Sequence, residues 1–218
     1  MRLQSAIFDM DGTLLDSMPT WRELGPTFLK EAGIPATPEQ DRMLHILADC
    51  DVIPYLREVC GLPWSQQEII DQIIQRMETF YSSQVRPKPG LEKFLSILKM
   101  EGVWMYVATA THRRLTEKAL KTAGIDHYFR GIVTSADAGN HKSESADIYE
   151  MAMRRLQSNK RDTVVFEDAL HAIRTAKAAG FRVAGVYEAT AEQDQPEIQR
   201  LCDYYIRSYE ELVQSETF

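Results

Sequence analysis

The sequence predicts an α/β protein, with a doubly wound, Rossmann-like parallel sheet that carries an inserted α-helical segment. From residue 91 onward, short apolar runs rich in β-branched and aromatic residues alternate with helical patterns. That alternation is typical of a parallel sheet covered by helices. Between residues 16 and 87 the periodicity is helical throughout, which sets this segment apart. We therefore expect a core of residues 1–15 and 88–218, with a helical insertion of residues 16–87.

The strands are expected where short apolar runs end in a turn or a polar residue. The first run, LQSAIFDMD, is followed by the helical segment, and VWMYVATA opens the second part of the core. Such continuous apolar runs are typical of strands buried on both faces. The expected strands lie at residues 3–9, 103–110, 131–135, 162–167, 181–187 and 203–206.

A repeated spacing of lysine and glycine predicts where four helices end. In each case a lysine lies three positions before a glycine. Glycine readily adopts the left-handed conformation just past a helix, and lysine favours the negative end of the helix dipole. The four pairs are Lys30 and Gly33, Lys99 and Gly102, Lys121 and Gly124, and Lys177 and Gly180.

Composition limits the classes of partner. The chain has 218 residues, 25 Lys and Arg against 32 Asp and Glu, and a formal charge of -7, so it lacks the basic surface expected for nucleic acid or anionic membranes. We find neither an apolar run long enough to span a membrane nor a signal-peptide pattern, and we expect a cytoplasmic protein. Cys50, Cys60 and Cys202 have no CxxC spacing, which favours reduced thiols.

The first strand ends in Asp9-Met10-Asp11-Gly12-Thr13, which places two carboxylates one residue apart. If the chain turns at Gly12, both acids face one crevice, where a hard divalent cation such as Mg²⁺ would offset their repulsion. The same cation would neutralise an incoming phosphate, so that Asp9 could attack phosphorus. Asp11 would then protonate the leaving oxygen and later activate water.

With this motif the sequence resembles the haloacid dehalogenase superfamily, and within it the β-phosphoglucomutase-like phosphatases with a helical cap. The resemblance implies that Thr109 and the backbone N–H of Ala110 bind the transferring phosphoryl group. It also implies that Lys142 balances charge between nucleophile and phosphate, although Lys142 lies five positions before Asp147, where the family often has four, and Ala146 replaces a proline. The implied metal ligands are Asp9, the backbone carbonyl of Asp11, Asp168, and Glu167 either directly or through water.

Individual residues favour some of the reactions catalysed within this family over others. The second acid, Asp11, argues against a dehalogenase, because a halide leaving group needs no proton. Phosphonatases of the family use a cap lysine, and no lysine occurs between Glu31 and Pro87. A hexose phosphate mutase of the β-phosphoglucomutase type is the alternative to a phosphomonoester hydrolase. It would use a cap histidine where this chain has Trp21, and an indole cannot exchange a proton, so hydrolysis is preferred.

The helical segment is expected to act as the cap that determines specificity for a small phosphorylated metabolite, with a sugar phosphate favoured. We expect the protein to be a monomer or a weak dimer. A catalytically idle binding module is a third reading, which the intact catalytic positions disfavour. The candidate pocket residues are Ser17, Trp21, Arg22, His45, Asp49 and Arg57 in the insertion, with His112 and Arg113 in the core.

Overall fold

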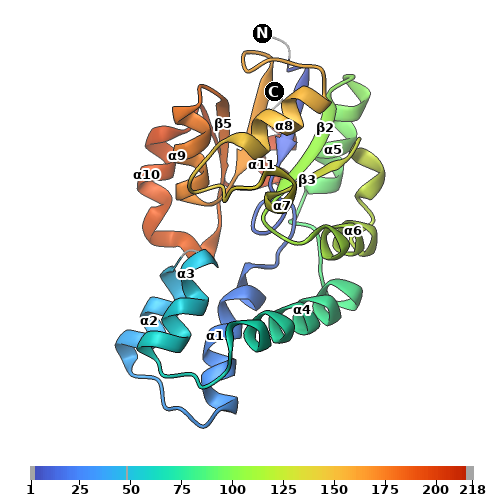
Figure 1. Cartoon of the computed structure of the whole chain (residues 1–218). Coiled ribbons are helices and arrows are strands. Elements are labelled where there is room, and N and C mark those ends of the chain that lie inside the picture. The colour runs from blue at the N-terminus through green and yellow to red at the C-terminus, as the bar shows by residue number, and fades with distance from the viewer. Residues whose placement is uncertain (1–2, 48, 215–218) are drawn as a thin grey trace. The chain divides into compact units, whose positions relative to one another are not determined.

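The chain divides into two compact units in the computed structural model (Figure 1). The structure describes residues 3–47 and 49–214, without the side chains at positions 45, 46, 49 and 50. One unit comprises Met1–Asp16 with Tyr81–Phe218, and the other is Ser17–Phe80. The sequence placed the insertion at residues 16–87. The C-terminal end of the last inserted helix and the segment up to residue 87 lie instead in the first unit.

The first unit is built on six parallel strands in the order β3-β2-β1-β4-β5-β6. From β1 at the centre, β2 and β3 are added on one side, and β4, β5 and β6 are then added on the other. This is the doubly wound arrangement. Each of the six expected runs contains one strand, so the predicted fold class is confirmed. The strands are β1 (Ser5–Phe8), β2 (Trp104–Thr109), β3 (Ile132–Thr134), β4 (Thr163–Glu167), β5 (Arg182–Val186) and β6 (Tyr204–Ile206).

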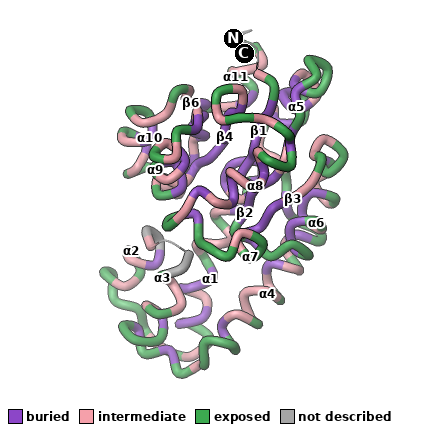
Figure 2. Tube along the Cα trace, turned by 45° about the horizontal axis from the view of Figure 1, so that its top comes forward, coloured by how far each residue is buried: buried purple, intermediate pink, exposed green. Residues whose placement is uncertain are grey.

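Helices cover both faces of this sheet, because successive side chains of the buried central strands point to opposite faces. Ile7 of β1 belongs to an apolar cluster with residues of α8, α9 and α10. Its neighbour Phe8 stacks on Phe166 of β4 at 4.3 Å between ring centroids, and Phe94 of α5 lies 5.8 Å from Phe166. The buried colour along β1 and β4 in Figure 2 reflects this double cover. The core helices are α5 (Leu91–Met100), α6 (Arg113–Thr122), η2 (Asp126–Tyr128), α7 (Ser135–Ala138), α8 (Asp147–Arg155), α9 (Leu170–Ala178), η3 (Ala189–Asp194), α10 (Gln195–Leu201) and α11 (Tyr209–Gln214).

The second unit is helical in its described residues. Its core includes Phe28 of α1, which meets Trp64 edge to face at 5.5 Å between ring centroids. Arg76 of α4 lies over the same Phe28 ring at 5.4 Å and forms an ion pair of 2.7 Å with Glu31, so that α1 and α4 are joined. The elements are α1 (Met18–Glu31), α2 (Pro38–Ile46), α3 (Asp49–Pro54), the π-helix η1 (Tyr55–Val59) and α4 (Gln66–Ser83).

All four helices with the lysine–glycine spacing end at the expected place. The glycines have φ between 70° and 86°, in the left-handed region. Each glycine N–H donates to the carbonyl of the lysine three positions earlier, at 2.9 to 3.1 Å. The next residue then donates to a carbonyl five positions back, which completes the Schellman hydrogen-bond pattern. Among the described residues, no helix is both long and apolar enough to cross a membrane.

Candidate active site

The candidate site lies at the carboxyl edge of the sheet, where three strands end in polar residues. Asp9 directly follows β1, Thr109 ends β2, and Glu167 ends β4 with Asp168 next in the chain. Because Phe8 pairs with Phe166 in register, Asp9 comes level with Glu167, and its N–H donates to the Phe166 carbonyl at 2.9 Å. The strand order also reverses between β1 and β4, and ligands of such sheets bind at this crevice.

A tight loop after Asp9 folds the second half of the motif back over the strand ends. The N–H groups of Leu14 and Leu15 both donate to the Met10 carbonyl at 2.9 Å, which closes the loop. Gly12 has φ of 85°, a conformation that strongly favours glycine. The closed loop places the Thr13 hydroxyl where it donates to Oδ1 of Asp168 at 2.7 Å, linking the first and fourth motifs.

Lys142 is buried, with 6% of its side chain exposed, and its ammonium lies between two carboxylates. It donates to Oδ1 of Asp9 and, at 2.7 Å, to Oε1 of Glu167. Burial disfavours its charge, but Asp9 and Glu167 more than offset this, so the pKa of Lys142 lies above its ordinary value. The structure therefore brings the predicted lysine to the predicted nucleophile. Lys142 lies in a turn over His141–Ser145, in which the Ser145 N–H donates to the His141 carbonyl at 3.1 Å.

Glu167 accepts four hydrogen bonds, which uses all the acceptor positions of a carboxylate. Lys142 and the Tyr149 hydroxyl donate to Oε1 at 2.7 and 2.8 Å. The backbone N–H groups of Asp168 and Ala169 donate to Oε2 at 3.0 and 3.2 Å. Burial alone would raise the pKa of Glu167, but Lys142, the Tyr149 hydroxyl and the Ala169 N–H together lower it below its ordinary value. In this arrangement Glu167 is a charged anchor for Lys142.

Three buried carboxylates offer oxygen atoms within 4.8 Å of one another, namely those of Asp9, Glu167 and Asp168. Burial raises the pKa of Asp9 well above its ordinary value and that of Asp168 to about 8. Lys142 supplies only one positive charge for these three acids, so their fully ionised form lacks a full counter-charge. A hard divalent cation with oxygen ligands fits such a cluster, and Asp9 and Asp168 are the acids best able to bind it, because Glu167 already accepts four donors.

Asp11 is held by two hydroxyl groups that the sequence did not indicate. Tyr81 donates to its Oδ1 at 2.5 Å and Thr111 donates to its Oδ2 at 2.7 Å. The N–H of Thr111 also donates to Oγ1 of Thr109 at 3.1 Å, which ties the second strand end to the same group of residues. The position of Thr111, two residues after Thr109, was a usable signal. Tyr81 gave none, because it lies at the end of a helix 70 residues from Asp11 in sequence.

The expected pocket residues range from buried to exposed, and the hydrogen bonds of Arg22 and Arg113 do not involve the acid cluster. Ser17 is buried, Trp21 and Arg22 are half-buried in α1, and Arg22 donates to the Leu47 carbonyl at 2.9 Å. Arg113 forms a 2.7 Å ion pair with Asp137 and donates to the Ile132 carbonyl at 2.9 Å, so it joins α6 to β3 and α7. Arg57, Ala110 and His112 are exposed residues. The side chains of the last two candidates, His45 and Asp49, lie outside the described part of the structure.

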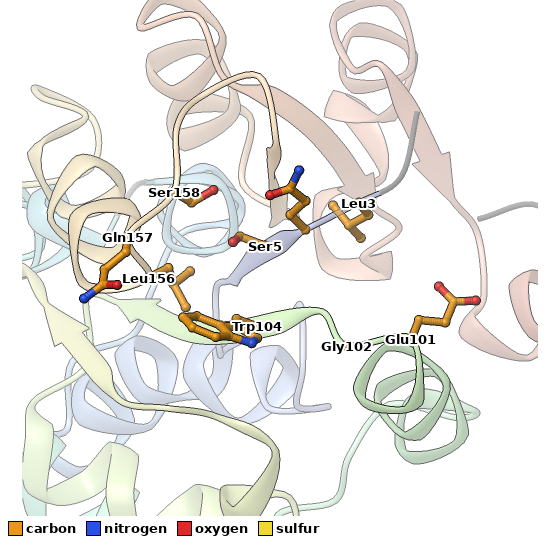
Figure 3. A pocket seen from close by; sticks show the side chains of 9 residues that line it. Leu3, Ser5, Glu101, Gly102, Trp104, Leu156, Gln157 and Ser158 are labelled. Atoms are coloured by element: carbon orange, nitrogen blue, oxygen red, sulfur yellow. The ribbon is translucent and has the colours of Figure 1, made fainter.

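A hollow of about 510 Å³ lies at the opposite edge of the sheet, beside the amino ends of β1 and β2 (Figure 3). Trp104, Gln157 and Ser158 are among its lining residues. The Arg130 guanidinium lies 3.4 Å from the centroid of the Trp104 ring. None of the clustered acids lines this hollow, so it is separate from the candidate active site.

Known proteins of similar sequence include two phosphatases that match more than four-fifths of this chain. The phosphorylated carbohydrates phosphatase of Thermotoga maritima is 26% identical over 185 residues, covering 84% of this chain and 85% of the relative. The fructose-1-phosphate phosphatase YqaB of Escherichia coli strain K12 is 26% identical over 190 residues, covering 85% and 97%.

Solved structures share the fold over almost the whole chain. A mutant of CbbY from Rhodobacter sphaeroides, in complex with xylulose-(1,5)bisphosphate, superposes with a TM-score of 0.79 at 23% identity, covering 97% of this chain and 96% of that one. β-Phosphoglucomutase from Clostridium difficile superposes with a TM-score of 0.75 at 18% identity, covering 97% and 93%.

A family model matches most of the chain. The model described as haloacid dehalogenase-like hydrolase matches residues 6–186, which span the strand ends that carry Asp9, Thr109 and Asp168. The chain therefore belongs to the haloacid dehalogenase-like hydrolase family.

Proposed function

We propose that this enzyme, a hydrolase of phosphoric monoesters, cleaves small phosphorylated metabolites by transferring their phosphoryl group to Asp9 with the help of Mg²⁺. The observation that carries this proposal is the meeting of Asp9, Lys142 and Asp168 at one edge of the sheet, with Lys142 bonded to Asp9. A carboxylate nucleophile needs neighbouring positive charge when it approaches an anionic phosphate. Asp9 and Asp168, with the Asp11 carbonyl, would hold the Mg²⁺, and the ion would supply further positive charge for the phosphate oxygens.

The chain's own residues divide the reaction into two steps. In the first, an Asp9 oxygen forms a bond to phosphorus while the bond to the leaving oxygen breaks, and Asp11 gives that oxygen a proton. Lys142 and the Thr109 hydroxyl would interact with the phosphoryl oxygens. In the second step Asp11 takes a proton from water, whose oxygen attacks phosphorus and releases phosphate from Asp9. Both carboxylates then return to their starting states.

Sugar phosphates are the favoured substrate class. The relatives include proteins named for phosphorylated carbohydrates, fructose 1-phosphate and hexitol phosphates, each matching more than four-fifths of this chain. We propose that the helical unit Ser17–Phe80 acts as a cap over the site and selects among such compounds. A screen of phosphorylated sugars, nucleotides and short acids, with released phosphate as the readout, tests the class. Faster release from nucleotides than from any sugar phosphate would contradict it.

The proposed nucleophile is tested with Asp9→Asn, which keeps the shape of the side chain and removes its charge. We expect loss of measurable phosphate release, and the same loss when EDTA removes Mg²⁺ from the wild type. Asp16→Asn, at an exposed acid just outside the loop, is the matched control and should keep wild-type turnover. Turnover by Asp9→Asn comparable to that of the control would exclude Asp9 as nucleophile.

The mutase alternative keeps one observation in its favour, since a β-phosphoglucomutase has the same fold. The two activities differ in their products. With β-glucose 1-phosphate as substrate, a mutase would accumulate glucose 6-phosphate, whereas the proposed hydrolase releases glucose and phosphate. Trp21 at the place of the expected cap histidine leads us to expect the second result.

A further inference from the structure

We propose that Tyr81 and Thr111 are positioning residues that together fix the orientation of the Asp11 carboxylate during leaving-group protonation. This inference rests on the proposed function, in which Asp11 is the acid and base. The two residues come from segments far apart in the sequence. Tyr81 lies in α4 and Thr111 in the loop after β2, and both bond to the same carboxylate.

The geometry suits a positioning role because the two bonds reach different oxygens. The Tyr81 hydroxyl lies 2.5 Å from Oδ1, and the Thr111 hydroxyl lies 2.7 Å from Oδ2. The torsion that rotates a carboxylate about its last carbon–carbon bond is soft and has broad minima. One contact on each oxygen fixes this torsion, and with it the direction in which the carboxyl group presents a proton.

Both positioning side chains are themselves held firmly. Tyr81 is fully buried, and Thr111 is 8% exposed, whereas Asp11 is only half-buried. The Thr111 backbone is also bonded to the Thr109 hydroxyl at 3.1 Å, so its position is tied to the end of β2. The hydroxyls therefore provide two fixed points beside an acid that must remain accessible to substrate.

The hydrogen-bond partners of Asp11 differ in chemical type from the partner of the proposed nucleophile, Asp9. Asp9 is bonded to the Lys142 ammonium, which can donate hydrogen bonds but cannot accept them. Tyr81 and Thr111 offer Asp11 neutral hydroxyls, which can donate to a carboxylate and accept from a carboxylic acid. Two such partners keep both contacts available whether or not the acid carries the proton, as a group that gives up a proton and takes it back requires.

The test compares two leaving groups in Tyr81→Phe, Thr111→Val and the double variant. An alkyl phosphate, taken as the sugar phosphate that the wild type hydrolyses fastest, expels an alkoxide that needs the proton from Asp11. p-Nitrophenyl phosphate expels a phenolate that leaves without one. The value of kcat/KM reports the steps up to release of the leaving group, so it isolates the first step from the hydrolysis of phosphorylated Asp9.

We expect kcat/KM for the alkyl phosphate to fall about 10-fold or more in each single variant, a part of the roughly 10²- to 10⁴-fold contribution of general acid catalysis. For p-nitrophenyl phosphate it should change by less than about threefold. Thr111→Ser, which restores a hydroxyl, should recover most of the alkyl activity. Tyr128→Phe and Thr163→Val remove hydroxyls elsewhere in the same unit, bonded to Ser96 and to the Asn159 carbonyl, and should affect neither substrate.

Two results would overturn the inference: equal losses for both substrates, or no loss for either. Equal losses accompanied by a lowered unfolding temperature would identify Tyr81 and Thr111 as purely structural. The Asp9→Asn variant separates this failure from that of the proposed function. If Asp9→Asn is inactive toward both substrates while the hydroxyl variants behave as wild type, only the positioning role is lost. If Asp9→Asn remains active, the proposed function fails and the positioning role with it.

Discussion

At the scale of single residues, the burial of Lys142 between Asp9 and Glu167 has a direct functional consequence. Replacing it by methionine keeps the length and apolar stem but leaves two carboxylates without their shared cation. We expect Lys142→Met to lower turnover by on the order of 10²-fold or more, since removing one preorganised electrostatic partner of a reacting group has effects of this size. Steady-state release of phosphate from the best sugar phosphate measures the loss.

The matched control for this variant is Lys160→Met. Lys160 also pairs with a carboxylate, Glu150, at 2.7 Å, but it lies outside the acid cluster and is 35% exposed. An exposed pair of this kind contributes little to stability. Lys160→Met should retain wild-type turnover. A Lys142→Met enzyme that turns over as fast as Lys160→Met would remove Lys142 from the proposed reaction.

The residues that the sequence could predict are those whose place follows from the fold alone. Asp9, Thr109 and Asp168 stand at or next to strand ends, and the carboxyl ends of parallel strands meet at one edge. Tyr81 and Thr111 depend on side-chain reach across loops. Tyr81 in particular lies near the end of a helix whose direction is set by packing, which periodicity does not specify. Tyr81 was therefore beyond the reach of sequence analysis, whereas the position of Thr111, two residues after Thr109, was a usable signal.

At the scale of elements, the four lysine–glycine helix ends were predictable because each depends on local backbone conformation. Gly124 ends α6 with φ of 75°, and a Cβ placed there would meet nothing within 4 Å. Substitution at this position therefore tests the backbone conformation without a steric clash. We expect Gly124→Ala to lower the free energy of unfolding by about 1 kcal/mol, because L-residues other than glycine are strained in the left-handed region.

Gly124→Asn is the comparison that identifies the cause, because asparagine tolerates the left-handed conformation better than alanine. Its loss in stability, measured from urea unfolding curves, should be smaller than that of Gly124→Ala. Equal losses in the two variants would show that a feature other than backbone conformation sets the stability of this helix end.

The corner between β3 and α7 contains a carboxyl group, Asp137, whose contribution to folding stability should depend on pH. Asp137 accepts hydrogen bonds from the Thr134 N–H and from Arg113, and the pKa of its carboxyl is lowered, chiefly by the Thr134 N–H. A carboxyl with a lower pKa in the folded state contributes stability above its unfolded pKa of about 3.9 and loses it as the pH falls further. Wild type should therefore exceed Asp137→Asn in urea midpoint at pH 6, and the difference should shrink at pH 3. A difference independent of pH would mean that the charge is not the cause.

Element boundaries were less predictable than the elements themselves. The helical segment was expected to end at residue 87, whereas the compact helical unit ends at Phe80 within α4. Helical periodicity continues through α4 regardless of which unit its side chains contact, so the sequence pattern cannot place the division. The short π-helix η1, Tyr55–Val59, was likewise not indicated by any residue pattern.

At the scale of the whole molecule, the acid cluster links global stability to pH and to Mg²⁺. Burial raises the pKa of Asp168 to about 8, against an unfolded value of about 3.9. Between these values the folded state binds more protons than the unfolded state. The free energy of unfolding of the metal-free protein should therefore fall as the pH rises from about 5 to 8. Asp168→Asn, which carries no ionisable group there, should show a smaller fall over the same range.

Mg²⁺ should oppose this fall in stability with rising pH. To bind, the cation must displace the protons that Asp9 and Asp168 hold because of their raised pKa values. A ligand that binds only the folded state raises stability by RT ln(1 + [L]/Kd), so the gain from a fixed Mg²⁺ concentration should grow as protons leave the cluster. We expect the rise in unfolding temperature on adding Mg²⁺ to be larger at pH 8 than at pH 6 in the wild type, and to be small at both pH values in Asp168→Asn. Thermal unfolding followed by circular dichroism, with EDTA-treated protein as reference, measures all four shifts. Equal Mg²⁺ stabilisation of wild type and Asp168→Asn would show that the ion binds elsewhere, and equal shifts at the two pH values would show that its binding releases no protons from this cluster.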